Sequence, residues 1–363
     1  MDNILLNPGI PLDWGKSNAT PTGFGLQDPE FQQYRLSPFS LMRLWSSLGE
    51  PVYYYKTGLN YSNITIGFGN FLLMPTTVAI NYSTAARLLG INGTYGFQLS
   101  ITPIVSVSIS EVKEPPPSNR INLIVTVTGK GFPLANAVVS YCLIAVDLKG
   151  GEQSFPAYTL KYGNITTDAK GYTPPLYFDE IQDESDNYAF IAYAHVCGLM
   201  GVGYRQRVTS TQQYVIPFIE SLEEGRVIIA HSYDVHYFGP PSAEIAYNAT
   251  FLVLRESFVL DEIPLGAGKV GKVNYGEGKP YENVTIPTHD PGILVITYRK
   301  SNVEGGVVMM PWGVSAMAFP VVFGANPEGM EWVATDIRQV LVNNVAYQAK
   351  LALWSFEGYQ VIG

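Results

Sequence analysis

The chain has 363 residues, of which 47% are hydrophobic and only 15% are charged, against about 25% charged residues in typical soluble domains. Its 22 Lys and Arg against 31 Asp and Glu give a formal charge of −9, which argues against binding to nucleic acid or to anionic lipid. The length exceeds that of one ordinary core, so we expect two or three domains, and the 24 Tyr, 35 Gly and 25 Pro are typical of a β-rich extracellular protein.

The N-terminal segment, residues 1–111, is expected to carry two short helices and several strands. Ser37 and Pro38 are a cap and first residue for a helix over 39–49, in the sequence FSLMRLWSSLG. A second helix is expected over 83–90, with Ser83 as N-cap and Gly90 as its end. Residues 95–112 alternate apolar and polar side chains as a half-buried strand does. No secretory signal opens the chain, so an exported protein would have lost its original N-terminus.

Three prolines in KEPPPSNR mark residues 112–120 as a stiff linker. After it, strands and tight turns predict an immunoglobulin-like β-sandwich over 121–214, which could be an insertion. Residues 215–363 are expected to be β-rich and to pack with 1–111, because 1–111 has too few strands to close a core. The uncharged run 307–325 is broken by prolines and glycines, so it favours buried strands over a membrane span. The predicted fold class is therefore mostly β, a multi-domain β-sandwich architecture.

Two cysteines, Cys142 and Cys197, are the whole complement of thiols. In an extracellular chain such a pair predicts one disulfide, here between the facing sheets of the sandwich. The alternative is two buried free thiols. Neither cysteine has a His or Cys neighbour at metal-ligand spacing.

N-glycosylation acceptor triplets, Asn-x-Ser/Thr, are in excess. The chain contains 45 Ser and Thr and twenty Asn, so chance predicts about two or three acceptors. It has eight, of which Asn60 and Asn63 stand three residues apart on an extended segment. Residues three apart on a strand face opposite sides of it. We therefore expect that pair to lie on an edge strand or a protruding loop, where sugar could be carried on both sides. The eight acceptors are Asn18, Asn60, Asn63, Asn81, Asn92, Asn164, Asn248 and Asn283.

Residue types that carry catalysis occur without the spacing that catalysis needs. His231 and His236 would face opposite sides of a strand, and Gly266 to Lys272 lacks the Ser or Thr of a phosphate-binding loop and is expected to be a flexible loop. The acidic segment 178–187 could hold Ca²⁺ or paired carboxylates, but a solvated hairpin tip is favoured. We therefore predict no catalytic, cofactor-binding or metal site.

Several phrases of the chain resemble the ectodomains of archaeal type IV pilin-like surface proteins. They are NPGIPLDWG, FGLQDP, YRLSPFSLMRL and ARLLGINGTYGFQLSI in the N-terminal part, and GILVITYRK, VVMMPWGVSAMAFPVVFG and EWVATDIRQVLVNNVAYQAKLALW towards the end. In that family the first phrases follow a single hydrophobic helix cut by a class III signal (prepilin-type) peptidase. The resemblance covers most of the chain outside the central sandwich, and it carries no catalytic positions. It implies a membrane-tethered or pilus-associated exoprotein.

These observations together predict a non-catalytic, N-glycosylated cell-surface protein that forms filaments or adheres through protein–protein assembly. Its partners would be further copies of itself or other pilus subunits, with no nucleic acid and no cofactor. Contact with the membrane would come only through an N-terminal helix that this sequence lacks. Two alternatives stay open: a secreted carbohydrate-binding or carbohydrate-active protein, and a structural protein of an archaeal virus.

Overall fold

The computed structural model describes residues 1–30, 34–44, 50–66, 70–115, 121–148, 157–182, 184–209, 212–236, 243–255, 260–272, 278–287, 289–301, 303–330 and 332–356. The chain is mostly β with few helices, which confirms the predicted fold class. It divides into two compact units. Unit 1 comprises Met1–Ser46, Thr77–Ile104 and Gly313–Gly363, and unit 2 comprises Ser47–Thr76 and Val105–Trp312.

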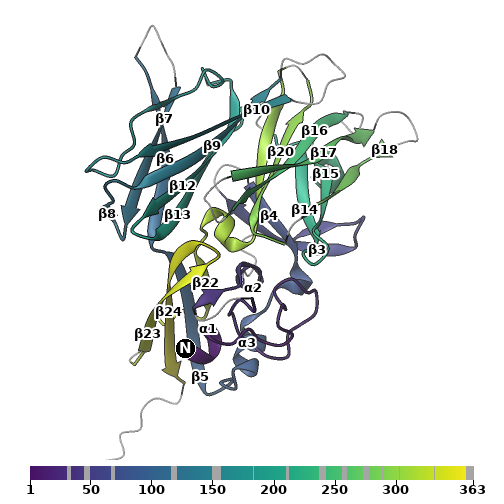
Figure 1. Ribbon diagram of the computed structural model, residues 1–363. Helices are drawn as coiled ribbons and strands as arrows, with labels where there is room; N and C mark the ends of the chain where they lie inside the picture. The colour runs from purple at the N-terminus through teal and green to yellow at the C-terminus, as the bar shows by residue number, and fades with distance from the viewer. Residues whose placement is uncertain are drawn as a thin grey trace, which may run out of the picture. The chain divides into compact units, whose positions relative to one another are not determined.

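Unit 1 is built on one five-stranded sheet of order β1-β23-β24-β5-β22 (Figure 1). Its core side chains come from alternate positions of the long strands, including Phe97, Leu99 and Ile101. The irregular N-terminal residues are held by Arg43, which is buried and donates to the carbonyls of Val78 (2.7 Å), Ala19 (2.8 Å) and Trp14. The elements are α1 (Asp2–Leu5), β1 (Arg35–Leu36), α2 (Pro38–Met42), η1 (Thr76–Val78), α3 (Tyr82–Leu88), β5 (Tyr95–Pro103), η2 (Val314–Met317), β22 (Val321–Gly324), β23 (Ala334–Val342) and β24 (Val345–Ser355).

The two predicted N-terminal helices are present, with one change of cap. Ser37 caps α2 as expected, since its side chain accepts from the Ser40 amide at 3.2 Å. The cap of α3 is Asn81 and not Ser83, because Asn81 Oδ1 reaches the Thr84 amide at 2.8 Å and also accepts from the Ser83 hydroxyl at 2.9 Å. The helix therefore starts earlier than predicted. The first helix ends at Met42 with Arg43 as its C-cap, earlier than predicted, and residues 45–49 lie outside the described residues.

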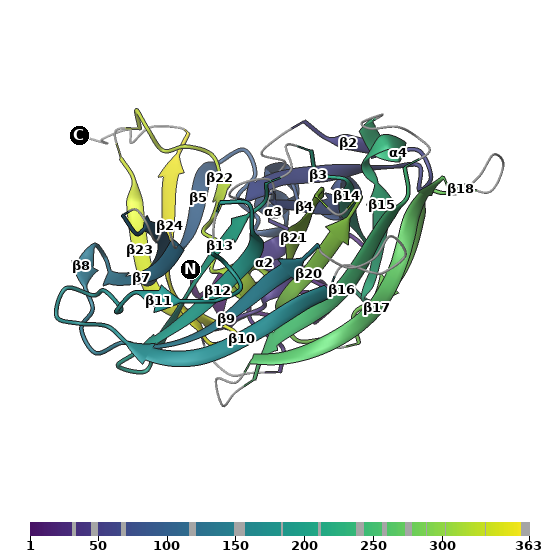
Figure 2. The same cartoon turned by 90° about the horizontal axis from the view of Figure 1, so that it is seen from above.

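The central part of unit 2 is a two-layer sandwich (Figure 1). One sheet has the order β10-β9-β12-β13, which Figure 2 shows from above, and the other has the order β11-β7-β6 with β8 paired to β7. Leu143, Phe190 and Val125 belong to the apolar core between the sheets. The strands are β6 (Val105–Lys113), β7 (Ile121–Gly129), β8 (Phe132–Pro133), β9 (Val138–Asp147), β10 (Ala157–Thr166), β11 (Leu176–Tyr177), β12 (Asn187–Val196) and β13 (Leu199–Arg207).

The sandwich begins before the predicted linker. Strand β6 pairs with β7 from Val105↔Gly129 to Lys113↔Ile121, so the proline-rich segment 112–120 connects two strands of one sheet. Residues 116–120 of that segment lie outside the described residues. Strands β13 and β6 approach each other closely at Gly201. A Cβ at that position would lie 2.6 Å from the Val105 carbonyl oxygen. A larger residue there would push the two strands apart.

The rest of unit 2 contains three further sheets, of orders β18-β17-β16-β20-β21, β14-β15-β19 and β2-β3-β4. Figure 2 shows β21, β20, β16 and β17 side by side. A second core joins Phe218 and Ile228 to Tyr54 and Tyr61 of the β2-β3-β4 sheet. The elements are β2 (Val52–Tyr54), β3 (Leu59–Ile66), β4 (Asn70–Pro75), β14 (Val215–Ser221), β15 (Arg226–His231), α4 (Ser232–His236), β16 (Ile245–Leu254), β17 (Leu260–Lys272), β18 (Gly278–Lys279), β19 (Tyr281–Thr285), β20 (Gly292–Arg299) and β21 (Gly305–Trp312).

The uncharged run 307–325 falls on β21, η2 and β22, of which β21 is buried along its whole length. Buried strand structure was predicted there, and the prolines and glycines divide it as expected. Among the helices that the structure describes, none combines the length and apolar character needed to cross a bilayer.

Candidate functional site

The acceptor asparagines lie at the surface wherever their side chains are described, with one partial exception. Asn248 on β16 is half-buried and has interactions of its own. The side chain of Asn63 lies outside the described residues. A glycan is bulky and hydrated, so it needs the accessibility that the other six have. The six exposed acceptors are Asn18, Asn60, Asn81, Asn92, Asn164 and Asn283.

Two of the exposed acceptors stand on strands at the end of a sheet order. Asn164 is on β10, the first strand of β10-β9-β12-β13, and Asn283 is on β19, the last strand of β14-β15-β19. An edge strand leaves backbone groups free to pair with another chain, and a side chain of large volume there hinders such pairing.

The paired acceptors Asn60 and Asn63 both belong to β3. Strand β2 pairs only with Leu59, Asn60 and Tyr61, whereas β4 pairs with β3 from Tyr61 to Ile66. Asn63 thus lies on a half of β3 that, among the described residues, pairs on one side only. Asn60 points away from the Phe218 core, because its neighbours Leu59 and Tyr61 are the residues that pack there.

The predicted disulfide is absent, and both cysteines are free. Cys142 and Cys197 do not come from facing sheets: Cys142 on β9 pairs with Ile191 of β12 in the same sheet. Cys197 follows β12, six residues beyond Ile191, which corresponds to roughly 20 Å along a strand. A disulfide needs Cα atoms within about 7 Å. Cys142 is buried and Cys197 exposed, and burial raises the pKa of the Cys142 thiol to about 12.

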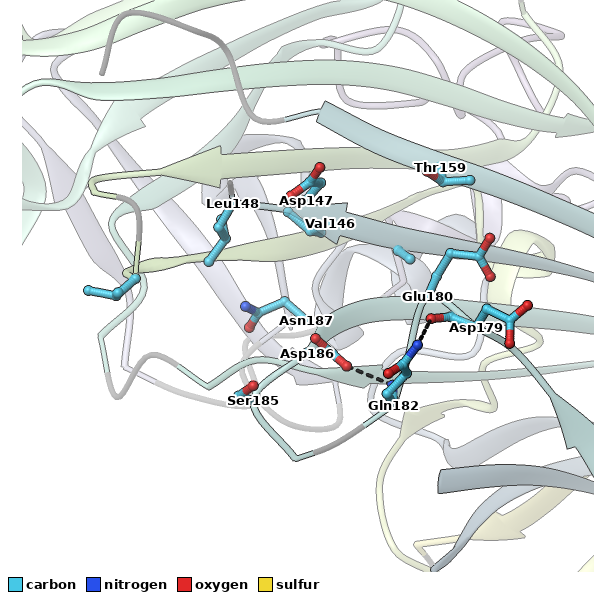
Figure 3. Close-up of a pocket in the computed structure, with 12 residues that line it drawn as sticks. Val146, Asp147, Leu148, Thr159, Asp179, Glu180, Gln182, Ser185, Asp186 and Asn187 are labelled. Carbon is cyan, nitrogen blue, oxygen red and sulfur yellow. Dashed lines mark hydrogen bonds between the residues drawn. The ribbon is translucent and has the colours of Figure 1, made fainter. Parts of the chain in front are cut away.

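A polar pocket of about 510 Å³ opens at one end of the sandwich. Figure 3 shows that its acidic side chains come from the end of β9 (Asp147) and from the segment between β11 and β12 (Asp179, Glu180 and Asp186). The antiparallel register brings these segments together, because Asn187 at the start of β12 pairs with Val146 near the end of β9. Asp147 had no signal in the sequence, since it stands far from the acidic segment in the chain.

Two of the acidic groups of the pocket, Glu180 and Asp186, have protein partners. Lys161 makes an ion pair with Glu180 at 2.9 Å, and the Gln182 amide donates to Asp186 at 2.7 Å. The Gln182 side chain donates to the Asp179 carbonyl oxygen at 2.9 Å (Figure 3). The described lining has no aromatic ring. In the described part of the chain, no three His, Cys, Asp or Glu residues gather as a metal site would require.

Only His231 of the histidine segment 231–236 is extended as predicted, and residues 232–236 are helical. His231 ends β15 and is buried, and α4 starts at the next residue. The His231 Nδ1 accepts from the Tyr233 amide at 3.0 Å, and the Tyr55 hydroxyl donates to Asp234 at 2.6 Å. Burial lowers the pKa of His231 to about 4, so the ring is neutral near pH 7. The side chain of His236 lies outside the described residues.

The glycine-rich segment from Gly266 to Lys272 is part of strand β17, and the flexible loop expected there is wrong. A register shift in the pairing of β16 with β17, between Ala249 and Thr250, accommodates Gly266 at a φ of +124°. Glycine adopts a positive φ of this kind at little cost, so Gly266 allows strand β17 to continue through the register shift.

No protein-family model matches this chain, and no curated protein is significantly similar to it.

Proposed function

We propose that this chain is the ectodomain of a non-catalytic, N-glycosylated cell-surface protein, pilin-like in its flanking segments, that acts through protein–protein assembly. The observation that carries the proposal is the excess of acceptor triplets, six of which have exposed asparagines. Chance would scatter such triplets over buried strands as well, and the chain has several strands that are buried along most of their length, among them β12, β16, β20 and β21. The pilin-like part of the proposal rests on the sequence resemblance.

The free cysteines remove one argument for an oxidising compartment. The proposal therefore depends on the acceptors and on the composition: few charges, abundant tyrosine and a net negative charge. Placement of acceptors on the edge strands β10 and β19 supports a surface role, because sugar at those positions would keep the edges from pairing with unintended strands.

The direct test is intact-mass analysis of protein isolated from its native cells, before and after chemical deglycosylation. We expect a mass above the 39.9 kDa polypeptide by several glycan increments, mapped by glycopeptide sequencing to the exposed acceptors. Asn122 and Asn187, which are not in acceptor triplets, serve as internal controls and should be unmodified. A native protein without sugar at any of the eight asparagines would overturn the proposal.

The surface location and assembly are tested separately on intact cells. Immunogold labelling with an antibody to the central sandwich should decorate the cell exterior, in linear arrays if the chain enters filaments. Label confined to the cell interior would contradict the surface location. Label on the cell surface without linear arrays would support an anchored ectodomain and contradict the formation of filaments.

The polar pocket favours one alternative, a carbohydrate-active protein, because glycoside hydrolysis uses two carboxylates in a cleft. The pairing of Glu180 with Lys161 and the lack of an aromatic platform in the described lining argue against it. Incubation with a panel of oligosaccharides, with Asp147→Asn as the matched variant, decides the matter. Hydrolysis lost in that variant would establish the alternative.

A further inference from the structure

Exposed tyrosines stand beside acceptor asparagines on the same strand face. Tyr162 precedes Asn164 by two residues on β10, and Tyr281 precedes Asn283 by two residues on β19. Side chains two apart on a strand share a face at a spacing of about 7 Å. All four side chains are exposed, Tyr162 at 48% and Tyr281 at 37%. Both sites have the pattern Tyr-x-Asn-x-Thr, with the threonine also exposed on that face.

A third pair forms across two strands. Tyr53 of β2 is directly opposite Asn60 of β3 in the register, and its side chain is 57% exposed. Directly opposite residues of an antiparallel pair have Cβ atoms about 5 Å apart. The neighbours Val52 and Tyr54 face the Phe218 core, so Tyr53 and Asn60 share the outer face.

The rings at the first two sites are held in place while much of their surface is open. Tyr162 lies directly opposite the buried Cys142 in the register of β10 and β9, and its hydroxyl interacts with the Cys142 thiol. The Tyr281 ring packs edge-on against Tyr54, at 6.5 Å between centroids and 88° between planes. A ring fixed in advance loses little conformational entropy when a second group packs on it.

We propose that Tyr162, Tyr281 and Tyr53 are stacking platforms for the first sugar residue attached to Asn164, Asn283 and Asn60. A pyranose ring presents an apolar C–H face, and an exposed aromatic ring is the matching surface. The inference rests on the proposed N-glycosylation and adds a role for the sugar: it covers an exposed ring and stiffens the strand that carries it.

Tyr61 provides a contrast within the chain. It precedes Asn63 by two residues, as in the other pairs, but its ring is buried against Phe218 at 4.7 Å between centroids. No platform is available to a sugar at Asn63 from that residue. Spacing in the sequence alone therefore does not identify a platform, and exposure of the ring does.

The test is a double-mutant cycle at the β10 site in the glycosylated protein. Thr166→Ala removes the acceptor triplet and leaves both Tyr162 and Asn164 in place. Tyr162→Thr removes the ring and keeps a residue that favours strands. Tyr162→Thr should accelerate hydrogen exchange of the β10 amides in both backgrounds. We expect the acceleration to be about 2- to 10-fold larger in the glycosylated protein than in the Thr166→Ala background, which carries no sugar at Asn164.

Two controls separate ring stacking from other effects. Tyr162→Phe keeps the ring and loses only the hydroxyl contact with Cys142, so it should retain most of the coupling. Tyr177→Thr removes an exposed tyrosine whose strand partner, Asn122, is not an acceptor, and it should act equally in both backgrounds. In NMR spectra, sugar C–H protons should be shifted upfield by the ring in the wild type and in Tyr162→Phe, and not in Tyr162→Thr.

The outcomes distinguish this inference from the function on which it rests. Sugar present at Asn164, with equal exchange in both backgrounds and no upfield shift, overturns the stacking inference and leaves glycosylation standing. Sugar absent from all eight acceptors overturns both. The same cycle at Tyr281 with Thr285→Ala repeats the test on β19.

Discussion

Strands β12 and β20, which lie inside their sheets, and strands β10 and β19, which end theirs, differ in the exposure of their side chains. Strand β20, inside its sheet, is buried at every residue, and β12 is buried from Asn187 to Ala194. Strands β10 and β19 are mostly exposed or half-buried, and each carries an acceptor asparagine. The comparison shows that two of the acceptor triplets lie on exposed edge strands, whereas Asn60 on β3 and the half-buried Asn248 on β16 belong to strands with a partner on each side.

The largest expected effect is the loss of an interior aromatic residue. Phe190 of β12 is buried and contacts Tyr141 at 5.6 Å and Phe178 at 6.0 Å between ring centroids. Phe190→Ala should lower the free energy of unfolding by about 3–5 kcal/mol. The edge control Thr159→Ala on β10 should change it by less than about 0.5 kcal/mol. Urea denaturation measures both, and equal effects would contradict the division between interior and edge.

Acid should destabilise unit 2 through His231, which ends the interior strand β15. The pKa of this histidine is lowered to about 4 in the folded chain because the ring is buried, whereas an unfolded histidine titrates near 6.5. Its stabilising contribution is full above pH 6.5 and is lost as the pH falls towards 4, by about 3 kcal/mol.

His231→Asn is the control for this pH dependence, because the amide oxygen can accept from the Tyr233 amide without titrating. Urea denaturation at a series of pH values should show a smaller loss in His231→Asn than in the wild type between pH 6.5 and 4. Parallel curves for the two proteins would refute the assignment.

The two cysteines provide a further comparison between a buried and an exposed position. The buried Cys142 should stay protonated at pH 8, because burial raises the pKa of its thiol to about 12, and one thiol per native chain, Cys197, should react with a disulfide reagent. Both should react after unfolding. Cys142→Ser should cost about 1–3 kcal/mol, whereas Cys197→Ser should cost less than about 0.5 kcal/mol. Two unreactive thiols that reducing agent releases would instead indicate a disulfide.

The smallest effects are expected at the edge acceptors in protein made without glycosylation. Asn164→Gln and Asn283→Gln should each change the free energy of unfolding by less than about 0.5 kcal/mol. The matched interior variant is Asn187→Gln on β12, where the buried side chain accepts from the Thr209 amide at 2.8 Å and hydroxyl at 3.1 Å. That variant should cost about 1–3 kcal/mol, and thermal melting ranks the three.

Local signals in the sequence predicted local structure well. The Ser37-Pro38 cap and the broken apolar run 307–325 each depend on neighbouring residues, and the structure agrees with both. The single strand predicted over 95–112 is wrong, because the alternating residues form two strands, β5 and β6, in different sheets. The α3 cap was missed because Asn81 and Ser83 both suit that position, and only the backbone decides between them.

The register in which the strands pair could not be predicted from the sequence. The cysteines were paired because both lie in the sandwich, but the register places Cys142 opposite Ile191 and leaves Cys197 at the far end of the strand. The same register brings Asp147 to Asp186 in the polar pocket, which no local pattern indicated. The Tyr53–Asn60 pair also depends on register, whereas Tyr162–Asn164 follows from the two-residue period alone.

The side-chain amide of Asn81 would have two roles, one for its oxygen and one for its nitrogen. Its oxygen organises the first turn of α3, whereas an N-linked sugar is joined to the nitrogen, so a glycoform could keep the turn intact. Enzymatic release of such a sugar converts the asparagine to aspartate. Aspartate is an equally good cap and adds negative charge at the positive end of the helix. Removal of the carbohydrate from this position should therefore leave α3 at least as firmly started as before.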